Sequence, residues 1–466
     1  MKRKSLNLVV LLLLISPFFA FATGGQEEVS EDGIKEVTIT VWTKAGPTEM
    51  WRGNAVIEAA KELNKELESE GIVVTVEAVQ ESAGWGDFNK KFTMASEAGK
   101  GPDILVTGHE NIAVYGTTGY IVPLADSVKE IKAMAPEFDD VIEGLWDMAS
   151  WRGQVWGIPQ DTEARPMFFN KPKLKELGWS DAKIAALPDE IAKGNFTLDD
   201  MIATGKDAIA AGVVEPGYGY WSRPKSGGDF IQYYMAYGGQ IYDPASDKLV
   251  IVKDALLDWY KFQRRIVTEG VIPENYLGKD WGIWHDTVSH GKALFFAGGV
   301  WHFSEWATQH VADIGGMDYL FENFGYALQP SGIRGEEAQQ LSHPLIYVVT
   351  SEKASGSSNQ DLAIRLLEKV TTKELNTKHA VESGHLGILK SQADYPPYKA
   401  DKLLSETLYM LDYAFFQPNH PYYPSYWSAL WTSMESVQNG VMTPEEGVQA
   451  VIDVLEADIG DAFIVK

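Results

Sequence analysis

Residues 160–165 place two carboxylates and one guanidinium close together, in Asp161, Glu163 and Arg165. Carboxylate and guanidinium groups form directional hydrogen bonds with the hydroxyl groups of a ligand. Two carboxylates could instead serve glycoside hydrolysis, one as general acid and the other as nucleophile or base. The chain has 65 acidic residues, so acid pairs at this spacing are expected by chance. We therefore expect this patch to bind hydroxyl groups rather than to catalyse a reaction.

Other patterns of catalysis or cofactor binding are missing from the sequence. It contains no GxGxxG run after a predicted strand, no P-loop, no GxSxG elbow and no HExxH pair. His285 and His290 are five residues apart, which places them on different faces of a helix, so they do not indicate a metal pair. We expect no enzyme activity, no cofactor and no metal.

The polar patch is flanked by extended segments. Residues 153–159 predict a turn into a short apolar strand, and residues 167–169 predict that the chain becomes extended again beyond the patch. Residues 170–172 then begin a helix, with Pro172 suited to its first turn. A strand that polar residues interrupt is typical of a chain that crosses from one lobe to another beside a ligand.

The preceding part of the chain alternates predicted strands and helices. The strands lie at 35–42, 71–79 and 101–106, and a helix follows each of them. This order indicates an α/β fold with a largely parallel sheet. Ligands lie beyond the carboxyl ends of such strands. The candidates that this rule selects directly follow the three strands: Lys44, Glu81, His109, Glu110 and Asn111.

Residues 1–22 have the three parts of a secretory signal peptide, namely a basic start, an apolar run and small residues two apart at Ala20 and Ala22. The alternative is a membrane anchor, since the apolar run could nearly span a bilayer. The small residues and the acidic segment 23–33 favour cleavage. Because the chain has no cysteine, neither a lipid-modified cysteine nor a disulfide can form. We therefore expect a free periplasmic or secreted protein.

The charge of the chain disfavours several partners. Its formal net charge is −25, and removing residues 1–22 leaves 37 basic and 65 acidic side chains, a charge of −28. Such a chain is repelled by nucleic acid and by anionic lipid. A mature chain of about 440 residues is too long for one core and suits two lobes. We expect a two-lobed monomer.

Several motifs resemble those of one family, in the same order along the chain. Residues 153–178, GQVWGIPQDTEARPMFFNKPKLKELG, are similar to the pattern GxxxGIPxxxxxxxxxYNKxxxxxxG of bacterial extracellular solute-binding proteins, the sugar-binding subunits of ABC importers related to maltose-binding protein. Residues 101–126 resemble the family's proline-aspartate-isoleucine strand, polar triplet and GxLxPL exit. GKALFFAGGVW at 291–301 is similar to GxAAMxxxGxW, and residues 424–446 resemble the end of the family's chain.

The resemblance implies a type II periplasmic binding-protein fold, in which two α/β lobes joined by three crossings close on a ligand. It implies a first crossing within 153–178, a second at 345–350 and a third near 391–400. It also implies that the loaded protein docks on the membrane permease subunits of an ABC importer. The lobe boundaries that follow are 23–163 plus 351–395 for the first lobe and 164–350 plus 396–466 for the second.

The resemblance also points to aromatic ligand contacts. A tryptophan can stack on the C–H face of a sugar ring, although most of the fifteen tryptophans should be core residues. Trp221, Trp301 and Trp427 occupy places where family members hold an aromatic residue against the ligand. Gly298 and Gly299, which precede Trp301, would let the backbone approach the ligand closely.

The polar triplet departs from that of maltose-binding proteins, which carry histidine-aspartate-arginine. Here Glu110 keeps a carboxylate but Asn111 replaces the arginine, which disfavours maltose itself and leaves a hydroxyl-rich ligand intact. The ligands that remain are a mono- or disaccharide, a polyol such as an inositol, and an oligosaccharide, with a polyamine as a lesser option. Two alternatives from other classes stay open: a secreted glycoside hydrolase and a non-catalytic surface adhesion or scaffold protein.

Overall fold

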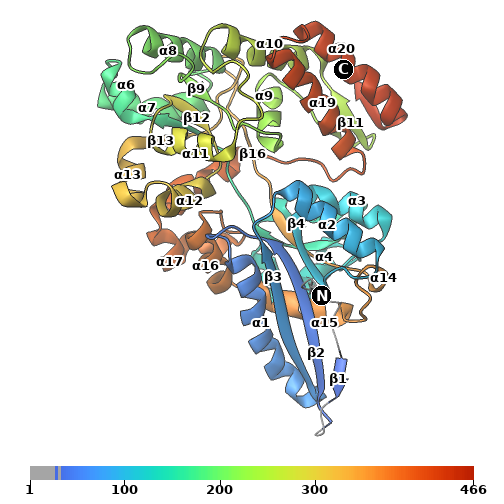
Figure 1. Ribbon diagram of the computed structural model, residues 1–466. Helices are drawn as coiled ribbons and strands as arrows, with labels where there is room; N and C mark the ends of the chain where they lie inside the picture. Colours follow the sequence, from blue (N-terminus) through green and yellow to red (C-terminus); the bar gives the residue numbers. More distant parts are fainter. Residues whose placement is uncertain (1–26, 30–32) are drawn as a thin grey trace, which may run out of the picture.

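The computed structural model describes residues 27–29 and 33–466, so the predicted signal peptide at 1–22 lies outside the described residues. The described chain forms two α/β lobes, one above the other in Figure 1. Each lobe has its own hydrophobic core, formed mainly by 37–158 and 345–370 in the first lobe and by 164–341 and 398–463 in the second. The predicted two-lobed α/β fold is confirmed.

The first lobe is built on a six-stranded sheet. Its strands are β1 (Glu27–Val29), β2 (Lys35–Lys44), β3 (Ile72–Glu81), β4 (Ile104–Gly108), β7 (Gly157–Asp161) and β15 (Leu345–Val349). β2 pairs in parallel with β3 and β4, as the alternation of strands and helices predicts. β15 lies between β4 and β7 and runs antiparallel to both. It begins at the end of the sheet where β4 and β7 finish, because the chain returns there from the second lobe. The sheet is therefore mixed, where the sequence predicts a largely parallel one.

Helices cover this sheet, and the longest, α1 (Trp51–Leu67), packs on β3 and α15 (Gln360–Val370) through buried residues such as Val56 and Leu63. A short hairpin of β5 (Ser150–Trp151) and β6 (Gln154–Val155) precedes β7. The helices of this part of the chain are α1 (Trp51–Leu67), α2 (Trp85–Glu97), η2 (His109–Asn111), α3 (Ile112–Thr118), α4 (Val128–Met134), α5 (Glu143–Met148), α14 (Glu352–Ser355), α15 (Gln360–Val370) and α16 (Lys373–Ser383).

The second lobe has a four-stranded sheet in the order β13 (Phe324–Ala327), β8 (Met167–Asn170), β12 (Phe295–Ala297) and β9 (Tyr220–Trp221). A smaller sheet joins β10 (Tyr242–Asp243), β11 (Lys248–Ile251) and β17 (Phe463–Val465). Its helices are α6 (Lys171–Glu176), α7 (Asp181–Ala192), α8 (Leu198–Ala210), η4 (Gly228–Phe230), α9 (Ile231–Ala236), α10 (Lys253–Thr268), α11 (Trp281–Ser289), α12 (Trp301–Gln309), α13 (Gly316–Asn323), α17 (Pro396–Ala400), α18 (Lys402–Thr407), α19 (Tyr423–Gln438) and α20 (Pro444–Asp458). Over residues 27–29 and 33–466, none of the helices combines the length and the apolar character that a bilayer span requires.

The chain passes between the lobes three times. Residues 162–166 link β7 to β8, and residues 328–344 link β13 to β15. The third passage is gradual, because α16 packs on α1 of the first lobe and on α12 of the second. Leu389 then packs in the first core and Tyr398 in the second. The expected second crossing at 345–350 is wrong, because residues 345–349 form β15 in the sheet of the first lobe. The other lobe boundaries stay a prediction.

Candidate ligand-binding site

A chain of alternating acidic and basic side chains starts at the first crossing. The guanidinium of Arg165 donates to the carboxylate of Glu163, and its other branch lies 3.0 Å from a carboxylate oxygen of Asp229 on η4. Arg223 donates to the same aspartate at 2.6 Å. Glu163, Arg165 and Asp229 are buried. The network therefore carries balanced charges and joins the crossing to the second lobe.

The two carboxylates of this network differ in how well their charge is compensated. Burial raises the pKa of Glu163 above its usual range in spite of the neighbouring Arg165. Burial also acts on Asp229, but Arg165 and Arg223 together hold the pKa of that carboxyl below its usual range. An opposite charge favours the ionised form, and desolvation disfavours it. Glu163 is therefore the carboxyl that gains more from an additional hydrogen-bond donor, such as a ligand hydroxyl.

The structure corrects the prediction for Asp161, which is completely buried. One carboxylate oxygen accepts from Arg52 at 3.1 and 3.3 Å and lies 2.9 Å from Nε2 of His379, while the other accepts the Leu345 backbone N–H at 3.4 Å. Because protein groups occupy both oxygens, Asp161 braces the crossing and does not face a ligand. Its pKa lies well below the usual range, since His385 and Arg52 outweigh the effect of burial.

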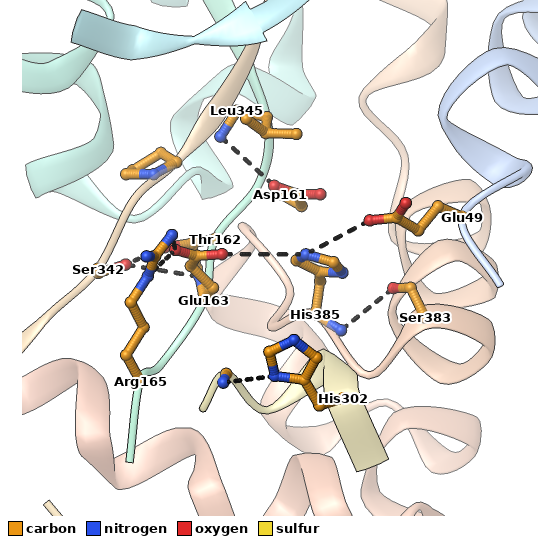
Figure 2. Close-up of polar contacts among 12 residues, drawn as sticks. Glu49, Asp161, Thr162, Glu163, Arg165, His302, Ser342, Leu345, Ser383 and His385 are labelled. Atoms are coloured by element: carbon orange, nitrogen blue, oxygen red, sulfur yellow. Dashed lines mark hydrogen bonds and ion pairs between the residues drawn. The ribbon is translucent and has the colours of Figure 1, made fainter. Parts of the chain in front are cut away.

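His385 lies at the centre of the groups that come together here (Figure 2). Its Nε2 lies 4.0 Å from a carboxylate oxygen of Glu49 and 4.0 Å from one of Glu163, and Arg52 lies 3.2 Å from the same nitrogen. Burial lowers the pKa of His385 to about 3, so the imidazole is neutral at physiological pH. Its ring is stacked on Trp301, with centroids 5.2 Å apart and planes 8° from parallel. His385 thus connects the first lobe, the first crossing and the second lobe.

Trp301, at the start of α12, is half-buried and lies beside the arginines of the network. The guanidinium carbons of Arg165 and Arg223 lie 5.2 and 5.8 Å from its ring. A Cβ at Gly299 would lie 1.9 Å from this indole, and one at Gly298 would lie 3.1 Å from His302. The two glycines therefore make room for neighbouring side chains, which corrects the expectation that they admit a ligand. The stacking of Trp301 on a ligand stays a prediction.

The predicted triplet after β4 divides into three different environments. Glu110 is 21% exposed and pairs with His343 of the second crossing at 2.7 Å. Asn111 is half-buried and donates to Thr107 at 3.0 Å. His109 is completely buried, and its two ring nitrogens lie 3.2 and 3.0 Å from the backbone carbonyl oxygens of Pro344 and Gln417. The expectation that His109 contacts a ligand is therefore wrong, because it packs between the crossing and the C-terminal segment.

The two candidates after β2 and β3 also differ. Lys44 is 21% exposed, and its ammonium lies 3.8 Å from Glu49 and 5.5 Å from the Trp85 ring. Burial lowers the pKa of Lys44, and the surrounding charges come from both lobes, including Glu305. Glu81 instead pairs with Lys91. Within residues 33–466, no hydrogen bond or ion pair connects Glu81 with the network of Glu163, so Glu81 stays a prediction with little structural support.

The other two predicted tryptophans differ in how deeply they are buried. Trp427, on α19, is half-buried, and its indole N–H donates to the Ser226 hydroxyl at 3.2 Å, so its role as a ligand contact stays a prediction. Trp221 is only 2% exposed, stacks on Tyr218 and donates to the backbone of Gly217 at 2.9 Å. The choice of Trp221 as a ligand contact is wrong, because the second core encloses its indole.

Glu305 is a site residue that the sequence reasoning missed. It lies four residues after Trp301 on α12, a spacing that places both side chains on one face of the helix. Burial raises its pKa to about 7, and Glu49 of the other lobe adds to this effect. Among the described residues its carboxyl lies 3.7 Å from Nε2 of His285, whose pKa is lowered by burial to about 3 so that the imidazole is neutral, and it makes no hydrogen bond. The other missed residues meet the site from distant segments: Glu49, Arg52, Arg223, Asp229, His343 and His385.

Within the part of the chain that the structure describes, three groups of histidine and acidic side chains are close enough to hold a metal ion. In one group, the Arg52 guanidinium lies within hydrogen-bond distance of both Asp161 and His385. In another, the rings of His285 and His310 stack 4.8 Å apart and 13° from parallel, so the two ring planes do not meet at a single ion. Neither group has the geometry of a metal site.

Two surface cavities lie away from this network. One, of about 780 Å³, is on the second lobe between α6, α7 and α13. The other, of about 430 Å³, lies between residues 147–152 of the first lobe and residues 235–242 of the second, beside 415–419. Neither is lined by Glu163, Arg165 or Trp301. Because the network joins charged and aromatic groups from both lobes, we place the candidate site there rather than at either cavity.

Two α/β lobes, three crossings and polar groups that converge between the lobes define a two-lobed binding protein. The chain belongs to the bacterial extracellular solute-binding proteins, since the model of that family matches residues 53–377. The predicted family is thereby confirmed.

Individual relatives have low sequence identity to this chain. The maltotriose-binding protein of Pyrococcus abyssi is 20% identical over 354 residues, which cover 75% of this chain and 69% of that protein. The crystal structure of the GacH receptor of Streptomyces glaucescens has a TM-score of 0.71 at 17% identity, covering 91% of this chain and 98% of that one. A solute-binding protein of Thermotoga lettingae bound with α-D-tagatose has a TM-score of 0.67 at 20% identity, covering 90% and 98%. These structural likenesses support the fold.

Proposed function

We propose that this protein captures a sugar or polyol between its lobes and delivers it to the permease of an ABC transporter. The observation that carries the proposal is the balanced polar network around Trp301. Glu163 and Asp229 are matched by Arg165 and Arg223, so the site suits a neutral ligand that both donates and accepts hydrogen bonds. Hydroxyl groups do both, and a half-buried indole is a platform for a sugar ring.

The named relatives support a carbohydrate ligand. Their names state maltotriose, acarbose and α-D-tagatose, so similar folds hold ligands from one sugar ring to several. The replacement of the family's arginine by Asn111 favours a ligand other than maltose. Nothing in the relatives favours an inositol in particular, and the mixed charges of the site give little support to a polyamine.

The remaining parts of the proposal follow from the family. The mature protein is a monomer outside the cytoplasmic membrane, released by cleavage near Ala22, and it docks on permease subunits in its closed, loaded form. It performs no catalysis. A raised pKa, as found for Glu305, is also what the general acid of a glycoside hydrolase requires, so turnover of the bound sugar has to be measured together with binding.

The experiment is thermal unfolding of residues 23–466, first unfolded and refolded to remove bound ligand, with a panel of sugars, polyols and polyamines. A ligand at about a hundred times its dissociation constant should add about 2.7 kcal/mol of stability. Stabilisation by one sugar without its turnover would support the proposal. Turnover would favour a glycoside hydrolase, and the absence of any shift, with larger glycans included, would favour an adhesion or scaffold protein.

A further inference from the structure

His343 lies on the second crossing and contacts the polar triplet of the first lobe. Its Nε2 is 2.7 Å from a carboxylate oxygen of Glu110, and the two side chains are 17% and 21% exposed. The sequence predicts the triplet as a ligand contact, but it does not predict the contact of Glu110 with His343, which lies 233 residues further along the chain. This contact links the end of β4 to a segment that must move when the lobes move.

Gly108 provides space for the Glu110 carboxylate, and His343 keeps that carboxylate ionised. Gly108 leaves the space it occupies, since a Cβ there would lie 2.3 Å from a carboxylate oxygen of Glu110. The backbone of Gly108 has φ −65°, which any residue can adopt, so the absence of a side chain matters for space and not for conformation. Burial would raise the pKa of Glu110, but His343 holds it at about 2, so this group is a carboxylate near neutral pH.

Charged and titratable groups from two segments face His343. Glu110 and His109 follow β4, while Glu163 and Arg165 belong to the first crossing. Burial alone would lower the pKa of His343, but the two carboxylates outweigh burial and the arginine, so the pKa lies above its usual value of 6.5. His109 is neutral, because burial lowers its pKa to about 4. Between the pKa of Glu110 and the pKa of His343, the contact is therefore an ion pair of a carboxylate with an imidazolium.

The same residues do not form a metal site. His109, Glu110 and His343 have potential ligand atoms within 4.8 Å of one another. However, both ring nitrogens of His109 face backbone carbonyl oxygens, at 3.2 and 3.0 Å, and no lone pair is directed at a shared ion. An ion pair between His343 and Glu110 accounts for the geometry without a metal.

We propose that His343 is a positioning residue of the ligand site, whose imidazolium holds Glu110 in place so that ligand affinity falls when His343 loses its proton. The proposal rests on the proposed function, because it takes Glu110 to be a ligand contact. A charge-assisted hydrogen bond is roughly twice as strong as a neutral one. The neutral imidazole can still donate to Glu110, so deprotonation weakens the contact without removing it.

The first test needs no ligand. The titration of His343 is followed by NMR in the full mature chain with labelled histidine, and its signal is assigned by its loss in His343→Gln. We expect a midpoint above 6.5 that falls in Glu110→Gln and in Gly108→Ala, which displaces the carboxylate. Glu143→Gln, at a 69% exposed carboxylate of α5 paired with Lys132, is the matched control and should leave the midpoint unchanged. A midpoint unaffected by Glu110→Gln would overturn the proposal.

The second test measures the affinity for maltotriose at pH 6 and at one pH unit above the His343 midpoint found by NMR. The wild type should bind about fivefold more weakly at the higher pH, as expected from the loss of charge assistance. His343→Gln, which donates a hydrogen bond but does not titrate, should change less than twofold. An equal pH dependence in both proteins would overturn the proposal. If maltotriose fails to bind at either pH, the proposed function fails for this sugar, while the NMR titration still decides whether His343 holds Glu110.

Discussion

The imidazole of His385 lies parallel to the indole of Trp301, with ring centroids 5.2 Å apart. His385 follows α16 at the junction of the lobes, and Trp301 begins α12 of the second lobe. The stacked pair covers one face of the indole and places it beside Glu163, Arg165 and Arg223. A binding platform that is held in place before the ligand arrives loses less conformational entropy on binding.

Replacement of Trp301 should weaken binding without unfolding the protein. We expect Trp301→Ala to lower the affinity for the stabilising sugar more than tenfold, because a half-buried aromatic platform is lost. Isothermal titration calorimetry measures the affinity, and circular dichroism checks the fold. Trp179→Ala, at a half-buried tryptophan near Lys183, is the control and should bind as the wild type does. Equal affinities for both variants would remove Trp301 from the site.

Arg165 should be required for stability as well as for binding. Arg165→Ala leaves the buried carboxylate of Glu163 without its guanidinium partner and leaves Asp229 with Arg223 alone, and breaking a buried pair in this way costs about 3–5 kcal/mol. The free energy of unfolding in urea measures this loss. Lys175→Ala, which breaks an exposed pair with Asp181, should change stability by less than about 1 kcal/mol. A similar, small loss in both variants would contradict the structure of the network.

The fold could largely be predicted from the sequence, but the site could be predicted only in part. The alternation of strand and helix patterns predicts β2, β3 and β4, because the hydrophobic period of each segment can be read from neighbouring residues. Asp161 and Glu163 look alike in sequence, yet Asp161 meets an arginine 109 residues away and turns inward. The sequence does not show which tryptophans the core encloses, since that depends on distant segments.

Acid should destabilise the protein through carboxylates that are paired in the folded state. Burial would raise the pKa values of Glu49 and Glu110, but Arg52 and His343 respectively hold both at about 2, against an ordinary 4.5. A depressed pKa contributes stability that is present above about pH 4.5 and is lost as the pH falls toward 2. Urea unfolding from pH 6 to pH 2.5 measures the loss. The double variant Glu49→Gln/Glu110→Gln should lose less stability over this range, and parallel profiles would contradict the assignment.

Glu305 should have the opposite pH dependence. Its pKa is raised to about 7 by burial and by Glu49, so the folded state is increasingly penalised as the pH rises from 4.5 to 7. Glu305→Gln removes this penalty, and we expect it to stabilise the protein at pH 8 but not at pH 4.5. The melting temperatures of both proteins at the two pH values provide the comparison. A variant that is less stable than the wild type at pH 8 would show that the ionised carboxylate is well compensated.

The proposed function requires that the two lobes close on a sugar held between them. Small-angle X-ray scattering of the refolded mature chain, with and without the sugar that stabilises it most, tests this claim directly. We predict a smaller radius of gyration in the presence of the sugar, because contacts from both lobes favour the closed form. Trp301→Ala at the same sugar concentration should keep the larger radius. Saturating sugar that leaves the radius of the wild type unchanged would contradict binding between closing lobes.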